Sequence, residues 1–428
     1  MDTTILLGKN YHSYLISFAL FERNKKVVLI DDHSQDAQDT AAIFDFERVL
    51  LETWGLDCQI PLLLELDNYL TPSPYCLIYN GRHLNLGNSP SENFNEIIRK
   101  FPNLLSLDPL KDERAREKFD QKFEAFSEKF GVKLFRFVEL SDLKIDIVWE
   151  LLPQELKDIF FDFKEQSKKE ELNFLFCFFQ GVYQHQFFKE RSDFELLFIM
   201  LFLLSPRFEI NRKKFEDDLS RFFKKGGGEM ISGENISFET KGSEVKKLSI
   251  SGKDPINLEK LFLTGSHFLG VSLTPDSKSC LTSIKMTLNI KTPDLINQEF
   301  YLSSDARIGG INPLTRIKFE KDALIGEVLI PYLPGTKEEF DEKAVLKILL
   351  NDLAKILGEI PHRDLSPLTS YTQKFWTQDL DNKSIGAYFW PFFHSPVKNL
   401  NIYPPSKSGP LGGLCVLAQI KDQRGHII

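Results

Sequence analysis

The chain has few cysteines, and none is arranged for a metal site or a disulfide framework. Its 428 residues contain five cysteines, scattered and without a C-x-x-C pair. An odd, dispersed set argues against a disulfide-stapled fold and against structural zinc, and it fits a reducing compartment. The eight histidines are also dispersed, with no two at metal-ligand spacing on one expected helix. We therefore expect no metal site and a cytoplasmic location.

Long apolar runs and an excess of basic charge are missing as well. The longest apolar stretch, LLFIMLFLLSP from Leu196, is much shorter than the roughly 18–20 residues of a membrane-spanning helix, so we expect a buried helix there. The N-terminus lacks the basic, apolar and small-residue regions of a signal peptide. A net charge of −8 excludes the basic footprint of a nucleic-acid-binding protein. Peripheral membrane contact, through lysines beside exposed phenylalanines, stays open.

Common catalytic signatures are absent, whereas phenylalanine is abundant. The sequence has no G-x-S-x-G nucleophile elbow and no G-x-x-x-x-G-K-[ST] phosphate loop. It has 38 phenylalanines against 4 tryptophans and 4 methionines, and they are densest between Phe160 and Phe223. The favoured interpretation of this block is an aromatic helical core. The alternative is a pocket for an apolar ligand.

The first 32 residues predict a βαβ unit. TTILLG is an aliphatic strand that ends in glycine, YHSYLISFALF has helical spacing of its apolar residues, and KKVVLIDD is a second buried strand. A unit of this length implies a right-handed crossover and two parallel strands. We therefore expect an α/β fold that begins with a parallel sheet.

The remaining patterns alternate between helix and strand. Helical patterns dominate from Pro72 to Arg207, and a further helix is expected over 212–225 with a glycine stop at Gly226. A short strand and three further strands follow, the last ending near Thr264, and alternation from Ser272 to Ile330 predicts antiparallel strands. A helix over 338–357 and a terminal strand, turn and helix complete the chain.

This order resembles the two-domain fold of the flavin-dependent amine oxidase and phytoene desaturase family, which the Rab GDP-dissociation inhibitors share. Four segments carry the resemblance: TTILLGKNYHSYLISFALFERNKKVVLIDD, FEDDLSRFFKKGGGEMISGENISFET, IPHRDLSPLTSYTQKFW and NLNIYPPSKSGPLGGLCVLAQI. It implies a Rossmann-like FAD/NAD(P)-binding domain built from discontinuous segments, with an inserted α+β substrate-type domain. The implied boundaries are 1–70, 208–265 and 376–428 for the first domain, and 71–207 and 266–375 for the second.

The same resemblance implies the positions that would contact a flavin dinucleotide. In the glycine fingerprint, the first glycine makes the tight turn, the second admits the pyrophosphate and the third lets the helix pack on the strand. An acid at the end of the second strand would hold the adenosine ribose, and a backbone contact would reach the adenine. These positions are occupied here by Gly8, Asn10, Ser13, Asp31, Ile236, Gly412 and Gly413.

Three departures from the family pattern weaken this site. The Asn10 side chain would project into the volume of the pyrophosphate, whereas Ser13 is small enough to be tolerated. After the ribose acid, DDHSQDAQDTAAIFD has five aspartates and no glycine, and these carboxylates repel a pyrophosphate. Pro405 and Ser406 stand where the terminal motif has a glycine and an acid. Asp31 also has a simpler interpretation, as an acid that ends a strand at the solvent.

Three functions follow from these observations. The first is a flavin-fold protein that has lost FAD and redox activity and binds an apolar ligand (lipid, isoprenoid or prenylated) or a protein partner. The alternative is an FAD-dependent oxidoreductase of the amine oxidase or phytoene desaturase type, acting on a hydrophobic or amine substrate. Its catalytic side chains stay unassigned, because the flavin would carry the chemistry. The third is a different nucleotide or a small anion at the Gly8 turn.

Overall fold

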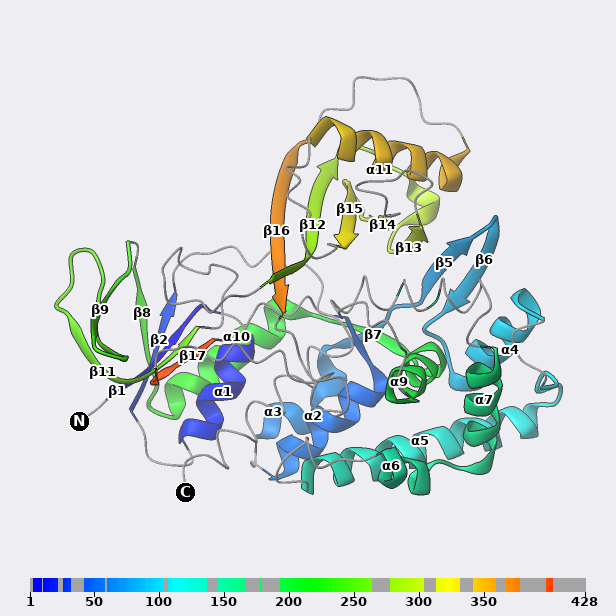
Figure 1. The fold of residues 1–428 in the computed structure, drawn as a ribbon, viewed down its shortest axis with the longest axis horizontal. Helices are drawn as coiled ribbons and strands as arrows, with labels where there is room; N and C mark the ends of the chain where they lie inside the picture. Colours follow the sequence, from blue (N-terminus) through cyan, green and yellow to red (C-terminus); the bar gives the residue numbers. More distant parts are fainter. Residues whose placement is uncertain are drawn as a thin grey trace.

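The computed structural model contains two large sheets and a helical part, shown in Figure 1. The residues that it describes are 3–9, 11–21, 26–31, 42–57, 60–102, 107–136, 145–166, 175, 178, 193–233, 235–263, 278–303, 313–331, 342–358, 367–377 and 398–402. Everything below concerns these residues.

The first sheet contains the predicted βαβ unit. Its seven strands run in the order β8-β2-β1-β11-β10-β9, with β17 also paired to β11. The pairs β8·β2, β2·β1, β1·β11 and β11·β17 are parallel, and the pairs that join β9, β10 and β11 are antiparallel. The expected parallel sheet is confirmed, as are the short strand and the three further strands that follow the 212–225 helix. The strand bounds are β1 Thr3–Leu7, β2 Lys26–Asp31, β8 Glu229–Ser232, β9 Ser237–Lys241, β10 Glu244–Ser249, β11 Ile256–Leu263 and β17 Leu400–Ile402.

Two helices lie side by side next to this sheet, α1 (Tyr11–Phe21) and α10 (Arg212–Lys225) (Figure 1). Aromatic rings join them: Tyr14 meets Phe223 edge-on with ring centroids 5.8 Å apart. The bounds of α10 confirm the expected helix, and Gly226 is its C-cap. Gly228 follows closely, where a Cβ atom would lie 2.3 Å from the Phe223 ring. The glycines after α10 thus let the chain pass close to the aromatic layer on its way into β8.

The second sheet has seven strands in the order β16-β12-β15-β14-β13-β5-β6. Its pairs are antiparallel, as alternation predicted, except that β13 and β5 run parallel. Helix α11 (Glu342–Leu357) covers one face, where Leu349 and its neighbours pack on Ile317 and Val328. The strand bounds are β5 Tyr75–Tyr79, β6 Arg82–Leu86, β12 Lys278–Leu288, β13 Glu299–Ser303, β14 Leu314–Phe319, β15 Leu324–Pro331 and β16 Thr369–Thr377.

The hairpin β5–β6 lies inside the range 72–207, where helical patterns were expected to dominate and no hairpin was predicted. Asn80 and Gly81 form its turn with φ values of +48° and +72°. Positive φ at both central residues defines a type I′ turn, whose twist matches that of paired strands. The sequence carries this signal, because an Asn-Gly pair between YCLIY and RHLNL is a strong local indication of a hairpin.

The helical part surrounds a small sheet of three strands in the order β3-β7-β4. Four described phenylalanines of the dense block support an aromatic core, since Phe160, Phe163, Phe202 and Phe223 are at most 3% exposed and belong to one cluster. Phe161 is an exception, at 50% exposed. The elements are β3 Ala42–Phe44, α2 Asp45–Asp57, α3 Pro61–Leu64, η1 Leu66–Tyr69, β4 Leu70–Pro72, α4 Pro90–Lys100, α5 Glu113–Arg136, α6 Ile145–Leu151, α7 Gln154–Glu165, α9 Asp193–Leu204 and β7 Arg207–Ile210, with a short turn η3 (Pro293–Leu295) before β13.

The apolar run at Leu196 forms α9, and its residues Leu197, Met200 and Leu201 are fully buried. This confirms the expected buried helix. Among the described helices, none combines the length and the apolar character that crossing a bilayer requires.

Candidate functional site

The Gly8 turn closes the first βαβ unit. Gly8 follows β1 directly and has a φ of +109°, in the region that favours glycine. Its N–H donates to the carbonyl of Ile30 on β2 over 3.1 Å. The turn that the fingerprint requires is therefore present, and it is fixed between the two central strands of the first sheet.

Ser13 attaches the start of α1 to this turn. The side chain is fully buried, and its hydroxyl donates to the carbonyl oxygen of Gly8. A glycine at this position would allow close packing but could not make that bond. Asn10, Gly412 and Gly413 lie outside the described residues.

Asp31 ends β2 beside the Gly8 turn, and its carboxylate is paired with Lys9. The Lys9 ammonium lies 3.3 Å from Asp31 Oδ2, and the two side chains are 41% and 21% exposed. Burial by itself would lower the pKa of Lys9, but the Asp31 carboxylate outweighs it and raises that pKa. The acid predicted to hold a ribose thus already contacts a cation from the same turn. Lys9 was not among the predicted site residues, and its only signal in the sequence is its place inside GKN.

Ile236 lies in the turn between β8 and β9. It is partly buried and packs against the apolar cluster of the first sheet. The same turn contacts the strand end, because the N–H of Gly233 donates to the carbonyl of Asp31 over 3.1 Å. The structure therefore places Gly8, Ser13 and Asp31 together and brings the segment of Ile236 to the same strand end.

The described part of this site keeps a nucleotide-type shape with altered chemistry. Lys9 contacts one oxygen of the Asp31 carboxylate, Oδ2, so a ribose hydroxyl would share this acid with a cation. Exposed ion pairs are weak, about 0–1 kcal/mol, so this competition alone is a modest barrier. The described residues around Asp31 thus keep the tight glycine turn after β1, and they place a lysine beside the acid.

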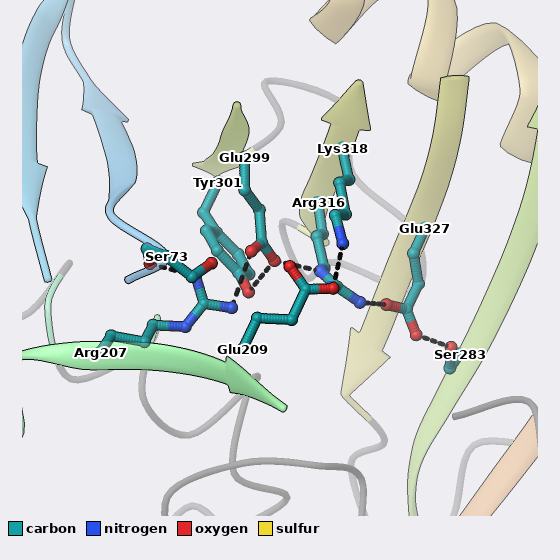
Figure 2. A network of polar contacts seen from close by, with 9 residues as sticks. All are labelled: Ser73, Arg207, Glu209, Ser283, Glu299, Tyr301, Arg316, Lys318 and Glu327. Carbon is teal, nitrogen blue, oxygen red and sulfur yellow. Dashed lines mark hydrogen bonds and ion pairs between the residues drawn. The ribbon is translucent and has the colours of Figure 1, made fainter. Parts of the chain in front are cut away.

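A second polar cluster lies far from this turn, between β7 and the second sheet. Figure 2 shows Arg207 and Glu209 of β7 facing Glu299, Tyr301 and Arg316. Arg207 Nη2 is 2.7 Å from Glu299 Oε2, and these side chains are 5% and 3% exposed. Tyr301 also donates its hydroxyl to the Glu299 carboxylate, and Arg316 forms an ion pair with it. Glu299 is thus held by three side chains from three strands.

Further pairs extend this cluster along the sheet (Figure 2). Arg316 Nη1 reaches Glu327 Oε2 over 3.4 Å, and Ser283 donates to the other oxygen of Glu327. Lys318 Nζ lies 2.7 Å from Glu209 Oε1. These side chains occupy the face opposite α11, because successive residues of a strand point to opposite faces. The cluster therefore links β7 to four strands of the second sheet.

Burial and mutual pairing set the protonation of the cluster. Burial acts to raise the pKa of Glu299, but the Arg207 and Arg316 guanidinium groups hold it well below its usual range. For Tyr301, burial and the neighbouring carboxylate both raise the pKa. Burial also lowers the pKa of Lys285 on β12 to about 8. Glu299 therefore stays ionised near neutral pH, with both guanidinium groups beside it.

This cluster is built to fix positions. The Arg207 guanidinium also lies over the Tyr75 ring, with Cζ 5.0 Å from the ring centroid. The backbone N–H of Arg207 donates to the carbonyl of Gly87. Removing one member of a buried ion pair leaves an uncompensated charge that costs about 3–5 kcal/mol. The sequence could not reveal the cluster, because its members span residues 207–327 without a common motif. No group of metal-ligating side chains occurs among the described residues.

No family model matches the chain, and no curated protein matches its sequence. Solved structures do match in fold. A Rab GDI from Plasmodium falciparum has a TM-score of 0.52 and 10% identity, covering 99% of this chain and 98% of its own. FqzB has a TM-score of 0.48 and 9% identity over 100% of this chain and 76% of its own. The halogenase PltM has a TM-score of 0.46 and 10% identity over 98% of this chain and 67% of its own.

At these identities, the likeness establishes the fold alone. The Rab GDI aligns with nearly the whole of both chains. The amine oxidase and phytoene desaturase family stays a prediction. The chain has an α/β, Rossmann-like FAD/NAD(P)-binding fold.

Proposed function

We propose that this chain is a flavin-fold protein that has lost FAD binding and redox activity and acts as a binding protein. The observation that supports this most directly is the pairing of Asp31 with Lys9 at 3.3 Å. In a dinucleotide site the corresponding acid is available to the ribose. Here the turn supplies its own cation to that acid.

The sequence around the turn adds two further obstacles to a dinucleotide. Asn10 replaces the glycine that admits the pyrophosphate, and the stretch after Asp31 is rich in aspartate and lacks glycine. Each effect is modest alone, but all three act on one ligand, one at the ribose and two at the pyrophosphate. Their sum supports loss of the cofactor rather than an altered way of holding it.

For the bound species, the described packing favours a protein partner over an apolar small molecule. Of the described phenylalanines in the dense block, Phe160, Phe163, Phe202 and Phe223 are packed into the hydrophobic core, and Phe161 is 50% exposed. One structural neighbour, the Rab GDI, is named for a protein partner, so the fold is compatible with this role. The lipid, isoprenoid and prenylated ligands of the sequence analysis remain the alternative within the proposal.

An absorbance spectrum of the chain, purified gently and then denatured to release any flavin, tests the loss of FAD. We expect no flavin band in either spectrum. A band close to one equivalent that bleaches on reduction would overturn the proposal and favour the FAD-dependent oxidoreductase. As a control, the same protein is mixed with excess FAD and desalted before the measurement, which separates an empty tight site from a weak one.

A further inference from the structure

A cleft of about 610 Å³ opens at the end of the second sheet where β5 and β13 begin. Because β5 and β13 are parallel, Phe300 lies beside Cys76, and the residues that precede both strands meet at this end. β6 pairs antiparallel with β5, so the segment that leaves β6 reaches the same place. Ile356, near the end of α11, forms another part of the wall. The cleft is therefore built from three parts of the chain that are far apart in sequence: the β5–β6 hairpin, the start of β13 and the end of α11.

Carboxamide side chains dominate the polar wall of this cleft. Asn85, Asn88, Asn297 and Gln298 all line it. Asn85, Asn297 and Gln298 are exposed, and Asn88 is half-buried. Each carboxamide offers donors and an acceptor without charge. In the part of the chain that the structure describes, the three asparagines use backbone atoms alone in their hydrogen bonds, which leaves their side-chain amides for a ligand.

The backbone that carries these amides is held firmly. The N–H of Asn297 donates to the carbonyl of Phe319 over 2.8 Å, and the N–H of Phe319 donates to the backbone carbonyl of Gln298 over 3.0 Å. Asn88 donates its N–H to the side chain of Asn93 over 3.1 Å. Glu299, the next residue after Gln298, belongs to the buried ion-pair cluster. A ligand would therefore meet preorganised groups, which lowers the entropy that binding costs.

The cleft presents little charge. Glu299 lines it, but its carboxylate is engaged by Arg207 and Arg316. Burial raises the pKa of the Cys76 thiol to about 11, so this thiol stays neutral beside His83 at 3.7 Å. Leu295 and Ile356 add apolar surface next to the amides. Among the described lining residues, the one carboxylate is engaged in ion pairs, whereas the amides and apolar side chains suit a neutral ligand with both polar and apolar parts.

We infer that this cleft binds a short, uncharged segment of a partner's polypeptide chain. Every residue of an extended peptide carries one N–H donor and one C=O acceptor, the pattern that carboxamides complement. An apolar side chain of the same segment would contact Leu295 and Ile356. The volume lies within the range of sites for small ligands, so it accepts a few residues. This inference rests on the proposed binding role and names its partner by class.

Selection from a phage-displayed library of random heptapeptides on the immobilised full chain tests the inference. The cleft variant combines Asn85→Ala, Asn297→Gly and Gln298→Ala; glycine suits position 297 because its φ is +66°. The matched control removes three exposed carboxamides elsewhere, by Asn68→Ala, Gln121→Ala and Gln154→Ala. We expect uncharged peptides to be enriched, and a synthetic copy to lose about tenfold or more in affinity with the cleft variant and nothing with the control.

Three results would overturn the inference: no enrichment over the blank surface, equal binding to the cleft variant, or enrichment confined to charged peptides. Neutral oligosaccharides that bind on a glycan array and are lost with the cleft variant would also overturn it, by assigning the cleft to a sugar. Melting curves check the fold, and the single exposed change Asn85→Ala repeats the test if the triple variant melts early. A flavin-free chain that binds no peptide would contradict only the peptide-binding role of the cleft. A flavin-loaded chain that binds peptides would contradict only the proposed loss of FAD binding.

Discussion

The Gly8 turn and the Arg207 cluster both rest on ion pairs, yet burial gives these pairs different weight. Lys9 and Asp31 are 41% and 21% exposed, whereas Arg207 and Glu299 are 5% and 3% exposed. An exposed pair is screened by water and can be exchanged at little cost. A buried pair cannot lose one member without stranding the other. Side chains of the turn can therefore be replaced while the fold persists. At the junction of β7 with the second sheet, replacing a single member of the buried pair destabilises the fold.

Removing Arg207 gives the largest effect that we expect. Arg207→Met leaves Glu299 buried with one of its two cations missing, and we expect unfolding to become easier by about 3–5 kcal/mol. Urea unfolding at neutral pH measures this. The matched control is Arg99→Met, whose side chain is 64% exposed beside Glu96 and should contribute about 0–1 kcal/mol. Equal losses in the two variants would erase the contrast between buried and exposed pairs.

Acid should weaken the buried cluster next. The pKa of Glu299 is lowered in the folded chain by its two arginines, against the opposing effect of burial. A carboxyl with a lowered pKa stabilises the fold above its unfolded pKa, and this contribution is lost as the pH falls below about 4.5 towards the folded value. Urea unfolding over this range should show falling stability in the wild type. The variant Glu299→Gln should start less stable and show a shallower fall; parallel curves would contradict the assignment.

Gly228→Ala tests how tightly the aromatic residues beside the first sheet are packed. The added Cβ would meet the Phe223 ring at 2.3 Å, so the aromatic layer beneath α1 and α10 must shift. We expect a loss of about 1–3 kcal/mol, the usual range for overpacking. The control is Gly242→Asn, at a hairpin turn with open space and a φ of +62°, which asparagine tolerates. Similar melting temperatures for Gly228→Ala and the wild type would show that the layer yields easily.

Lys9→Ala should have the smallest effect on stability. Its pair with Asp31 is partly exposed, and we expect a change of about 0–1 kcal/mol in the free energy of unfolding. Urea unfolding of this variant beside Arg207→Met compares the two regions directly. A loss of stability as large as that of Arg207→Met would mean that the Lys9–Asp31 pair is needed for folding and cannot be exchanged at little cost.

Local patterns predicted those parts of the fold that depend on local physics. The βαβ unit and α10 have the spacing of apolar residues that their burial requires, and Gly226 ends α10 as expected. The hairpin at Asn80 and Gly81 was missed although its turn signal is local, because the helical patterns around it were given more weight.

The polar sites were less accessible to sequence reasoning, because they depend on distant partners. Asp31 was assigned through the family resemblance, but its pairing with Lys9 depends on how the Gly8 turn folds back. Arg207, Glu299 and Arg316 meet across strands from three parts of the chain. No periodicity or motif connects such residues before the sheet topology is known.

Calorimetric titration of FAD into the wild-type chain tests the central claim most directly. We predict no saturable heat of FAD binding, because Asp31 is paired with Lys9 and Asn10 stands at the pyrophosphate position. Saturable binding near one equivalent of FAD would contradict it, and would make the Gly8 turn a working flavin site with altered contacts.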